Sequence, residues 1–377
     1  MALSSLQLRA FRNYRELLLP LHSDITVFTG RNGIGKTTIL EAVALLGSGR
    51  TFRQGKNLDL IHKGDEAGFV LGTVHDRGLE TEIKIRVYPQ GKKIFLNDKL
   101  AKSTASLLDL LPTIVFSPSD HRIVDGDSQD RKHFLNRAAL NVDWDYGEDS
   151  QAYNKVLLQR NRILRDAGAE GWSSTRLMDV LASWDEQLFT YGARLVLRRH
   201  YYLSDLGPKA AEEYQRISLS TDEFRLHYEA FGEEDFACPE TEAEVREIFV
   251  QKTRDSLRRD LASGSTQVGP HKDEILLTLN GNKVKFYGSQ GEKRTCALAL
   301  RLGELSLFRA KRNKSPMLLF DDVSSELDQA RRHSLVELLR KENTQVLITA
   351  TELPASLMGD VGRMFEHLEL NAVGVRD

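Results

Sequence analysis

Apolar and polar positions alternate near the start of this chain of 377 residues and later give way to a helical spacing. The alternation predicts short strands at residues 3–9, 15–21 and 24–29. A helix is expected from Lys36 to about Leu46, because apolar residues recur there every three or four positions. The first segment therefore begins as strands and passes through a glycine-rich loop into a helix.

A second group of strands is predicted after this helix. Alternating residues at 68–74, 82–87 and 94–96 indicate antiparallel strands, and Asn97-Asp98 marks a turn. Residues 113–116 form a further apolar run that ends at Ser117-Pro118 and is typical of a short strand.

The middle of the chain, from about residue 120 to 262, has a helical texture. Apolar residues between Leu177 and Leu195 repeat at three- and four-residue spacing, with Ser173-Ser174 as a candidate N-cap. Further helices are expected through Tyr153 and over about 240–262. None of these patterns is long enough for an extended coiled coil.

Strand patterns return after Gly264. Residues 274–279 and 283–286 flank Asn280-Gly281, which predicts a hairpin. The remaining pattern predicts a helix over about 290–310, a buried strand at 317–321, a helix over about 327–340 and a strand at 344–349. We expect an α/β domain that is interrupted by a helical lobe, with divisions at 1–119, 120–262 and 263–377.

Composition narrows the class of protein. A hydrophobic content of 41% and a charged content of 28% are typical of a soluble globular protein, and the net charge of −2 means that DNA binding would need a local basic face. Cys238 and Cys296 form no CxxC pair, so neither a zinc hook nor a disulfide framework is indicated. No apolar run approaches the roughly 18 residues of a membrane span, and no signal peptide is evident, so a cytoplasmic, nucleoid-associated protein is expected.

The glycine-rich loop carries the strongest chemical signal. Gly30 to Thr37 matches G-x-x-x-x-G-K-[ST], follows a predicted strand and opens a helix, as a P-loop does. Its backbone N–H groups and the helix N-terminus would bind phosphate oxygens. Lys36 would reach the β- and γ-phosphates, and Thr37 would ligate Mg²⁺.

Two carboxylates end a buried strand near the other end of the chain. Residues 317–320 are apolar, as a central parallel strand should be, and Asp321 and Asp322 follow directly. Asp321 would hold Mg²⁺ through water, and Asp322 would polarise the attacking water. A helix cap explains neighbouring serines but not an acidic pair at this place.

A third segment, Ser289-Gln290-Gly291-Glu292, lies just before a predicted helix. Taken alone, such a segment is usually a helix cap. Its place changes this interpretation, because it follows the P-loop and precedes the acidic strand end, which is followed in turn by Glu326-Leu327-Asp328. This order is found in ABC-type ATPases.

The chain as a whole resembles the RecF family, within the SMC/Rad50-like branch of ABC ATPases. The resemblance covers essentially the full length. It rests on residues 8–14, 30–38, 40–42, 115–120, 153–157, 159–161, 269–273, 289–291 and 320–328. The segments at 269–273 and 320–328 are the most specific to the family.

The resemblance implies an α/β ABC-type P-loop ATPase head with an inserted helical lobe. It also implies ATP and Mg²⁺ as cofactors, an ATP-dependent homodimer and a weak, DNA-stimulated ATPase. Ser289 and Gly291 of one subunit would contact the γ-phosphate held by Lys36 of the other. The implied nucleotide site comprises Arg12, Gly30, Arg31, Asn32, Gly33, Ile34, Gly35, Lys36, Thr37, Thr38, Ser289, Gly291 and Asp328, with Lys36, Asp321 and Asp322 as catalytic residues and Thr37 and Asp321 as metal ligands.

The sequence also departs from the wider ABC pattern. ABC ATPases usually carry a glutamine in the loop before the helical insertion, and residues 117–120 contain none. Asp322 stands where many relatives have glutamate. The usual switch histidine is missing, and its region offers only Thr349 and Thr351. Glu292-Lys293 replaces an amide-rich signature. These departures favour a slow clamp over a fast motor.

DNA binding is implied by the resemblance alone, since no base-reading motif is present. The expected ligand is double-stranded DNA with single/double-strand junctions, contacted through its backbone and without strong sequence preference. RecR-type and RecO-type mediator proteins are the implied partners, and no membrane is involved. Candidate contacts are Arg160, Arg162 and Arg165 on the inserted helix, with Arg50 and Arg53 after the P-loop helix, although a solvated helix face explains these arginines equally well.

Three alternatives remain. An SMC- or Rad50-like head would need long coiled coils, for which the insertion is too short. A transporter ATP-binding subunit is disfavoured by the large helical insertion and the missing switch histidine. A small-molecule P-loop kinase leaves the Ser289 segment and the Glu-Leu-Asp segment unexplained. The resemblance thus remains the best account of these motifs, and it implies recombinational repair of gaps and stalled replication forks as the function.

Overall fold

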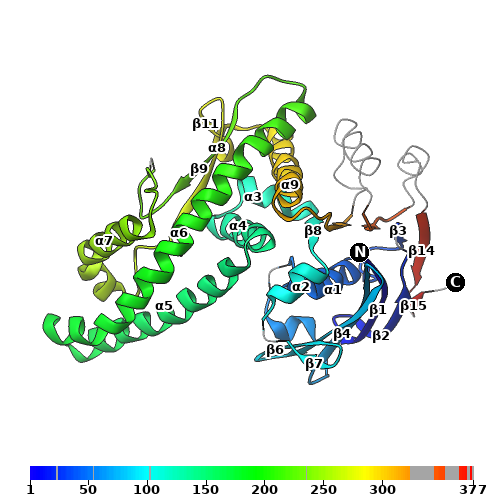
Figure 1. The fold of residues 1–377 in the computed structure, drawn as a ribbon, viewed down its shortest axis with the longest axis horizontal. Helices are drawn as coiled ribbons and strands as arrows, with labels where there is room; N and C mark the ends of the chain where they lie inside the picture. The colour runs from blue at the N-terminus through cyan, green and yellow to red at the C-terminus, as the bar shows by residue number, and fades with distance from the viewer. Residues whose placement is uncertain are drawn as a thin grey trace. The chain divides into compact units, whose positions relative to one another are not determined.

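The structure is a computed structural model that describes residues 1–22, 24–53, 55–101, 103–234, 236–322, 344–352, 365–371 and 374–375. Its chain divides into two units, which are described separately (Figure 1). The first unit contains residues 1–120 and 308–377, and the second contains residues 121–307.

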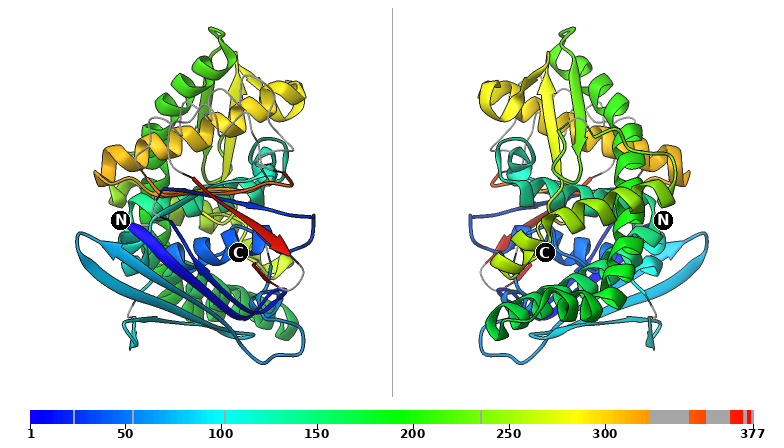
Figure 2. Two further views of the ribbon diagram at one scale, coloured as in Figure 1. Left: turned by 90° about the vertical axis from the view of Figure 1, so that its right-hand side faces the viewer. Right: turned by 90° about the vertical axis from the view of Figure 1, so that its left-hand side faces the viewer.

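The first unit has a long antiparallel sheet of six strands, in the order β2-β1-β4-β5-β6-β7. In β2, β4 and β5 buried residues alternate with more exposed ones, which is the pattern of a sheet with one face on the core. Figure 2 shows these strands in blue to cyan. They are β1 (Ala2–Phe11), β2 (Tyr14–Pro20), β4 (Gly68–Asp76), β5 (Leu79–Tyr88), β6 (Gly91–Leu96) and β7 (Lys99–Leu100).

A second six-stranded sheet in the same unit has the order β15-β14-β3-β13-β12-β8. Strands β8, β12, β13, β3 and β14 pair in parallel, so their carboxyl ends lie at one edge. The strands are β3 (Ile25–Thr29), β8 (Thr113–Phe116), β12 (Met317–Phe320), β13 (Val346–Thr349), β14 (Phe365–Asn371) and β15 (Gly374–Val375).

Helix α1 (Lys36–Ser48) belongs to the core of this unit. Ile39, Leu40 and Val43 are fully buried, together with residues of both sheets. Because the helix is buried on nearly all sides, it fixes the direction in which the preceding loop presents its backbone. Shorter elements complete the unit: η1 (Asn57–Leu60), α2 (Ala105–Leu110) and η2 (Pro118–His121), whose last residue begins the second unit.

The second unit is built mainly of helices around a small sheet of order β11-β10-β9. Capping boxes begin α4 at Asp127 and α7 at Thr241, which is why these helices start where they do. Helix α6 packs beside β9 (Figures 1 and 2). The elements are α3 (Arg122–Asp125), α4 (Ser128–Val142), α5 (Trp144–Glu170), α6 (Ser174–Ser218), β9 (Phe224–Glu229), α7 (Glu242–Ser263), β10 (Glu274–Leu279), β11 (Asn282–Lys283), α8 (Val284–Tyr287) and α9 (Gln290–Arg312), which continues into the first unit.

Three features differ from the expectations. Strand β9 lies within the stretch expected to be helical, and it pairs with β10 along its whole length. The expected strand at 283–286 is wrong beyond Lys283, because Val284–Tyr287 is a helical turn in which Val284 is buried and Phe286 is exposed. The expected division at 262/263 differs from the observed one at 307/308, since β10 pairs with β9 of the second unit.

The expected helix over 327–340 lies outside the described residues. Among the residues that the structure does describe, no helix is long and apolar enough to cross a membrane.

Candidate functional site

The loop between β3 and α1 has the backbone that its glycines predict. Gly30, Gly33 and Gly35 have φ values of 140°, 83° and 115°. A Cβ atom on Gly35 would lie 2.6 Å from side-chain atoms of Asn13 and Tyr14. Glycine is therefore required at position 35 both for its backbone conformation and for its close neighbours.

The N-terminus of α1 is open to a negatively charged ligand. Gly35 is the N-cap, no side chain caps the helix, and its first turn contains no acidic residue. Lys36 follows at once, and its Nζ donates to the carbonyl oxygens of Gly30 at 2.6 Å and Arg31 at 3.0 Å. The helix dipole, the backbone N–H groups and this ammonium all favour a phosphate group.

The acidic strand end lies beside the first turn of α1. Thr37 donates its hydroxyl to Asp321 Oδ1 at 2.8 Å, and Thr349 donates to the same oxygen at 2.9 Å. The backbone N–H of Asp322 in turn donates to Thr349 Oγ1 at 2.8 Å. Thr349 therefore links both carboxylate residues to the neighbouring strand end.

Burial changes the acid–base properties of this cluster. It raises the pKa of Asp321, against the hydrogen bonds from Thr37 and Thr349, which lower it. It also lowers the pKa of Lys36, which the charges of Asp322 and Asp321 oppose. A bound phosphate would favour the charged form of Lys36, and a bound cation would favour the charged form of Asp321.

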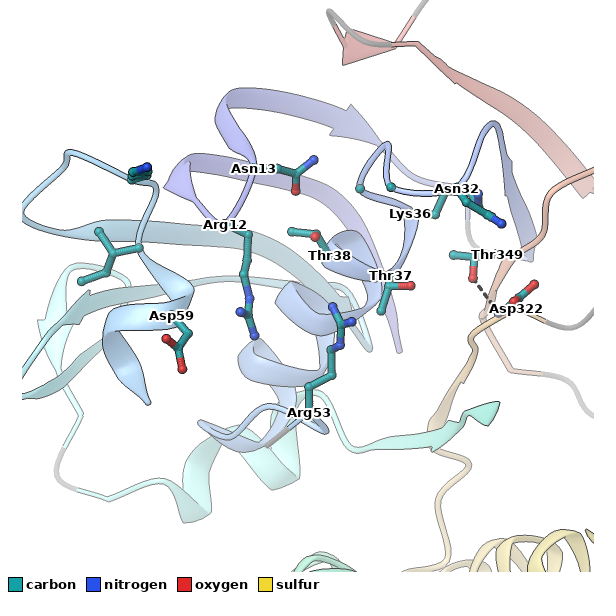
Figure 3. A pocket seen from close by; sticks show the side chains of 14 residues that line it. Arg12, Asn13, Asn32, Lys36, Thr37, Thr38, Arg53, Asp59, Asp322 and Thr349 are labelled. Carbon is teal, nitrogen blue, oxygen red and sulfur yellow. Dashed lines mark hydrogen bonds between the residues drawn. The ribbon is translucent and has the colours of Figure 1, made fainter. Parts of the chain in front are cut away.

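A cavity of about 490 Å³, within the usual size of a small-molecule site, lies beside this cluster, and Asp321 contacts two of its lining residues, Thr37 and Thr349. Figure 3 shows its side chains, including Lys36, Thr37 and Thr349. The lining residues are Arg12, Asn13, Asn32, Gly33, Gly35, Lys36, Thr37, Thr38, Arg53, Asp59, Ile61, Lys63, Asp322 and Thr349.

Arg12 reaches this cavity from the end of the first hairpin. Its guanidinium donates to both carboxylate oxygens of Glu41 on α1, from Nε at 2.9 Å and from Nη2 at 2.7 Å. The Glu41 side chain is fully buried, and that of Arg12 is 21% exposed.

The donor set also suits a hard divalent cation. The Thr37 hydroxyl and the Asp321 carboxylate would supply oxygen ligands, which Mg²⁺ prefers. The described residues include no cluster of three or more histidine, cysteine or acidic side chains that would hold a metal unaided. Mg²⁺ commonly takes one or two protein ligands together with phosphate oxygens, so the residues present fit such a cation.

The profile of the RecF/RecN/SMC N-terminal domain matches residues 2–363. A protein of Trichlorobacter lovleyi called DNA replication and repair protein RecF is 33% identical over 353 residues, covering 94% of this chain and 92% of the relative. Its counterpart in Geobacter sulfurreducens is 34% identical over 357 residues, covering 94% and 93%. The chain belongs to the RecF family.

Solved structures similar to this chain support the same family. The RecF structure described as RecF-ATPrS has a TM-score of 0.86 and 31% identity, covering 99% of this chain and 97% of the other. An Smc head domain derived from Pyrococcus furiosus has a TM-score of 0.52 and 14% identity, covering 100% and 95%, which shows a shared fold. The expected fold class, an ABC-type P-loop ATPase head with a helical lobe, is confirmed.

The structure brings together only part of the expected nucleotide site. Residues of the P-loop, Arg12, Asp321 and Asp322 meet in the first unit. Ser289 and Gly291 lie exposed at the start of α9 in the second unit. There Ser289 forms a capping box with Glu292: its N–H donates to Glu292 Oε2, and its hydroxyl accepts from the Glu292 N–H. Asp328 lies outside the described residues.

The prediction that Arg160 contacts DNA is wrong. Its side chain is fully buried and donates to Asp185 at 2.7 Å, to Asp260 at 2.7 Å and to Thr266 at 2.8 Å. Position 160 falls on the same helical stripe as the buried residues Tyr153, Leu157 and Leu164, which is the signal that could have revealed it. Arg162 and Arg165 lie on the exposed face of α5.

Sequence reasoning also missed residues of the cavity. Arg53, expected only as a DNA contact, lines this cavity, and its charge opposes the burial that raises the pKa of Asp321. Asn13 belongs to the motif at 8–14 but was assigned no role, and Asp59, Ile61 and Lys63 lie outside every motif. In the described part of the chain, the lining includes Thr349 but none of residues 117–120.

Proposed function

We propose that the chain is an ATP-dependent DNA-binding clamp of the RecF type, which acts in recombinational repair of gaps and stalled replication forks. The observation that carries this proposal is the cavity in which an uncapped helix N-terminus, Lys36 and the Thr37–Asp321 pair converge. Such a site has the charge and the donors for a triphosphate with Mg²⁺.

ATP binding would use the loop and the cations around it. The backbone of Gly30, Arg31, Asn32, Gly33, Ile34 and Gly35, with the first turn Lys36, Thr37 and Thr38, would cradle the phosphates. Lys36 would exchange its carbonyl acceptors for the β- and γ-phosphates. Thr37 and Asp321 would hold Mg²⁺, which neutralises charge developing on the transferred phosphate.

Hydrolysis would depend on Asp322 and would be slow. Asp322 follows the metal-binding position and lines the cavity, where its carboxylate would orient and activate a water molecule. Its backbone has a φ of 49° and is held by Thr349, so its place is set by the strand ends and not by a flexible loop. A short carboxylate, in a cavity whose described lining contains no histidine, fits a switch better than a rapid motor.

The second half of the site would come from another copy of the chain. Ser289 and Gly291 begin a 23-residue helix, and their exposure leaves this N-terminus accessible to a phosphate held by a second subunit. ATP would then join two subunits, and Asp328 would contribute at the same junction. DNA would stimulate this weak ATPase.

DNA would be held by basic side chains of the assembled dimer, with Arg162 and Arg165 as candidates from α5. The relatives named for DNA replication and repair support DNA as the ligand. Contacts from basic side chains to DNA phosphates would make the binding weaken steeply as salt increases. RecR-type and RecO-type proteins would be the partners through which recombinase is loaded at single/double-strand junctions.

Sedimentation of the wild type with and without Mg·ATP tests this function, with Lys36→Met and Ser289→Arg as matched variants. We expect ATP to convert the wild-type monomer to a dimer and neither variant to dimerise. A gapped duplex should bind the ATP form more strongly at low salt than at high salt. A wild type that stays monomeric with ATP and ignores the gapped duplex would refute the clamp.

A further inference from the structure

Glu41 is a buried carboxylate in the otherwise apolar helix that follows the P-loop. Its neighbours Leu40, Ala42 and Val43 are fully buried, and so is Glu41 itself. Its two described hydrogen bonds come from Arg12, which lies 29 positions earlier in the chain. Because a buried ion pair is often no more stabilising than apolar residues of similar size, packing alone does not account for this carboxylate.

The geometry of the Arg12–Glu41 pair determines which N–H donors of Arg12 can still bind a ligand. Glu41 accepts from Nε and from one N–H of Nη2, which together form one edge of the planar guanidinium. The adjoining edge, formed by Nη1 and the second N–H of Nη2, lies outside this pair. Such an edge presents two parallel donors, which match two oxygens of a phosphate group.

The backbone of Arg12 is fixed as firmly as its side chain. Its φ is 53°, its N–H donates to the carbonyl oxygen of Leu60 at 2.9 Å, and its carbonyl oxygen lies 2.8 Å from Nδ1 of His62. The hairpin end and the η1 segment therefore hold one end of the residue, while Glu41 holds the other. Arg12 lines the same cavity as Lys36 and Thr37 (Figure 3).

We propose that Glu41 is a positioning residue for nucleotide binding. It holds the guanidinium of Arg12 so that the free edge meets a phosphate of the bound nucleoside triphosphate, and it fixes that edge before the ligand arrives. Glu41 itself touches no ligand. The inference rests on the proposed nucleotide site and adds a function for a residue that no phosphate-binding motif includes.

A double-mutant cycle measures this coupling. The variants are Glu41→Gln, Arg12→Gln and the pair combined, and affinity for a slowly hydrolysed ATP analogue is measured with Mg²⁺. We expect each single change to weaken binding about tenfold and the double variant to bind no more weakly than Arg12→Gln, because both changes remove one positioned contact. Glu66→Gln, an exposed carboxylate outside the cavity lining, is the matched control and should bind as the wild type does.

Two further variants keep the test decisive. Arg12→Lys retains the charge opposite Glu41 but lacks the forked edge, so it should lose affinity to a similar extent even if Glu41→Gln folds poorly. Lys36→Met reports on the site itself. If Lys36→Met binds the analogue normally, the proposed nucleotide site is wrong. If Lys36→Met loses binding while Arg12→Lys or a folded Glu41→Gln binds normally, the site stands and the role of Glu41 is refuted; additive losses in the cycle refute it as well.

Discussion

Replacement of Arg160 by alanine should unfold the helical unit far more readily than replacement of its exposed neighbour Arg162. The change removes a fully buried guanidinium and leaves Asp260, also fully buried, without its ion-pair partner. It also deprives Asp185 and Thr266 of the same donor. Removing one partner of a buried pair costs about 3–5 kcal/mol, and we expect about 4 kcal/mol here.

The three tryptophans provide the assay for this change. Trp144, Trp172 and Trp184 all lie within residues 121–307, so tryptophan fluorescence during urea unfolding reports on the second unit. Arg162 is 74% exposed and pairs with Asp166 at 4.0 Å, and Arg162→Ala should therefore change the free energy of unfolding by no more than about 0.5 kcal/mol. The reasoning is refuted if Arg160→Ala costs less than about 1 kcal/mol and yet weakens DNA binding by a folded protein.

Three further predictions concern single side chains. Burial lowers the pKa of His271 to about 4, although a hydrogen bond with Thr266 opposes the shift. The contribution of this histidine to stability should therefore be complete above about pH 6.5 and fall by up to roughly 3 kcal/mol as the pH approaches 4. In urea unfolding from pH 4.5 to 7, the free energy of unfolding of His271→Gln should change less steeply with pH than that of the wild type. Gly35→Ala should cost at least about 1–3 kcal/mol through backbone strain and close contacts, and it should abolish ATP binding in calorimetry. Thr349→Val removes the link between Asp321 and Asp322, and it should lower the hydrolysis rate roughly tenfold with little change in ATP affinity; an unchanged rate would contradict this role.

The sequence predicted the P-loop well because its structure depends on adjacent residues. The glycines determine local backbone conformations, and the strand before them and the helix after them follow clear apolar patterns. The parallel strand that precedes Asp321 was predictable for the same reason. Local patterns failed at residues 283–286, where apolar alternation exists in the sequence but only Val284 is buried.

Contacts between distant segments were beyond prediction from one sequence. The pairing of Arg12 with Glu41 and the placement of Arg53 and Thr349 in one cavity require the folded sheets. Charge alone was misleading for Arg160, since its two acidic partners come from α6 and α7 and lie 25 and 100 positions away. A basic residue on an apolar stripe is better interpreted as a buried ion pair than as a surface contact.

The central claim is that one catalytic site is completed by two copies of this chain. Mixing Lys36→Met with Ser289→Arg tests it most directly, because each variant damages a different half of the site. Each variant alone should lack ATPase activity, and an equimolar mixture should regain up to about half of the wild-type rate, since only mixed dimers would form and each would hold one intact site. A mixture as inactive as its components, beside an active wild type, would contradict the shared site.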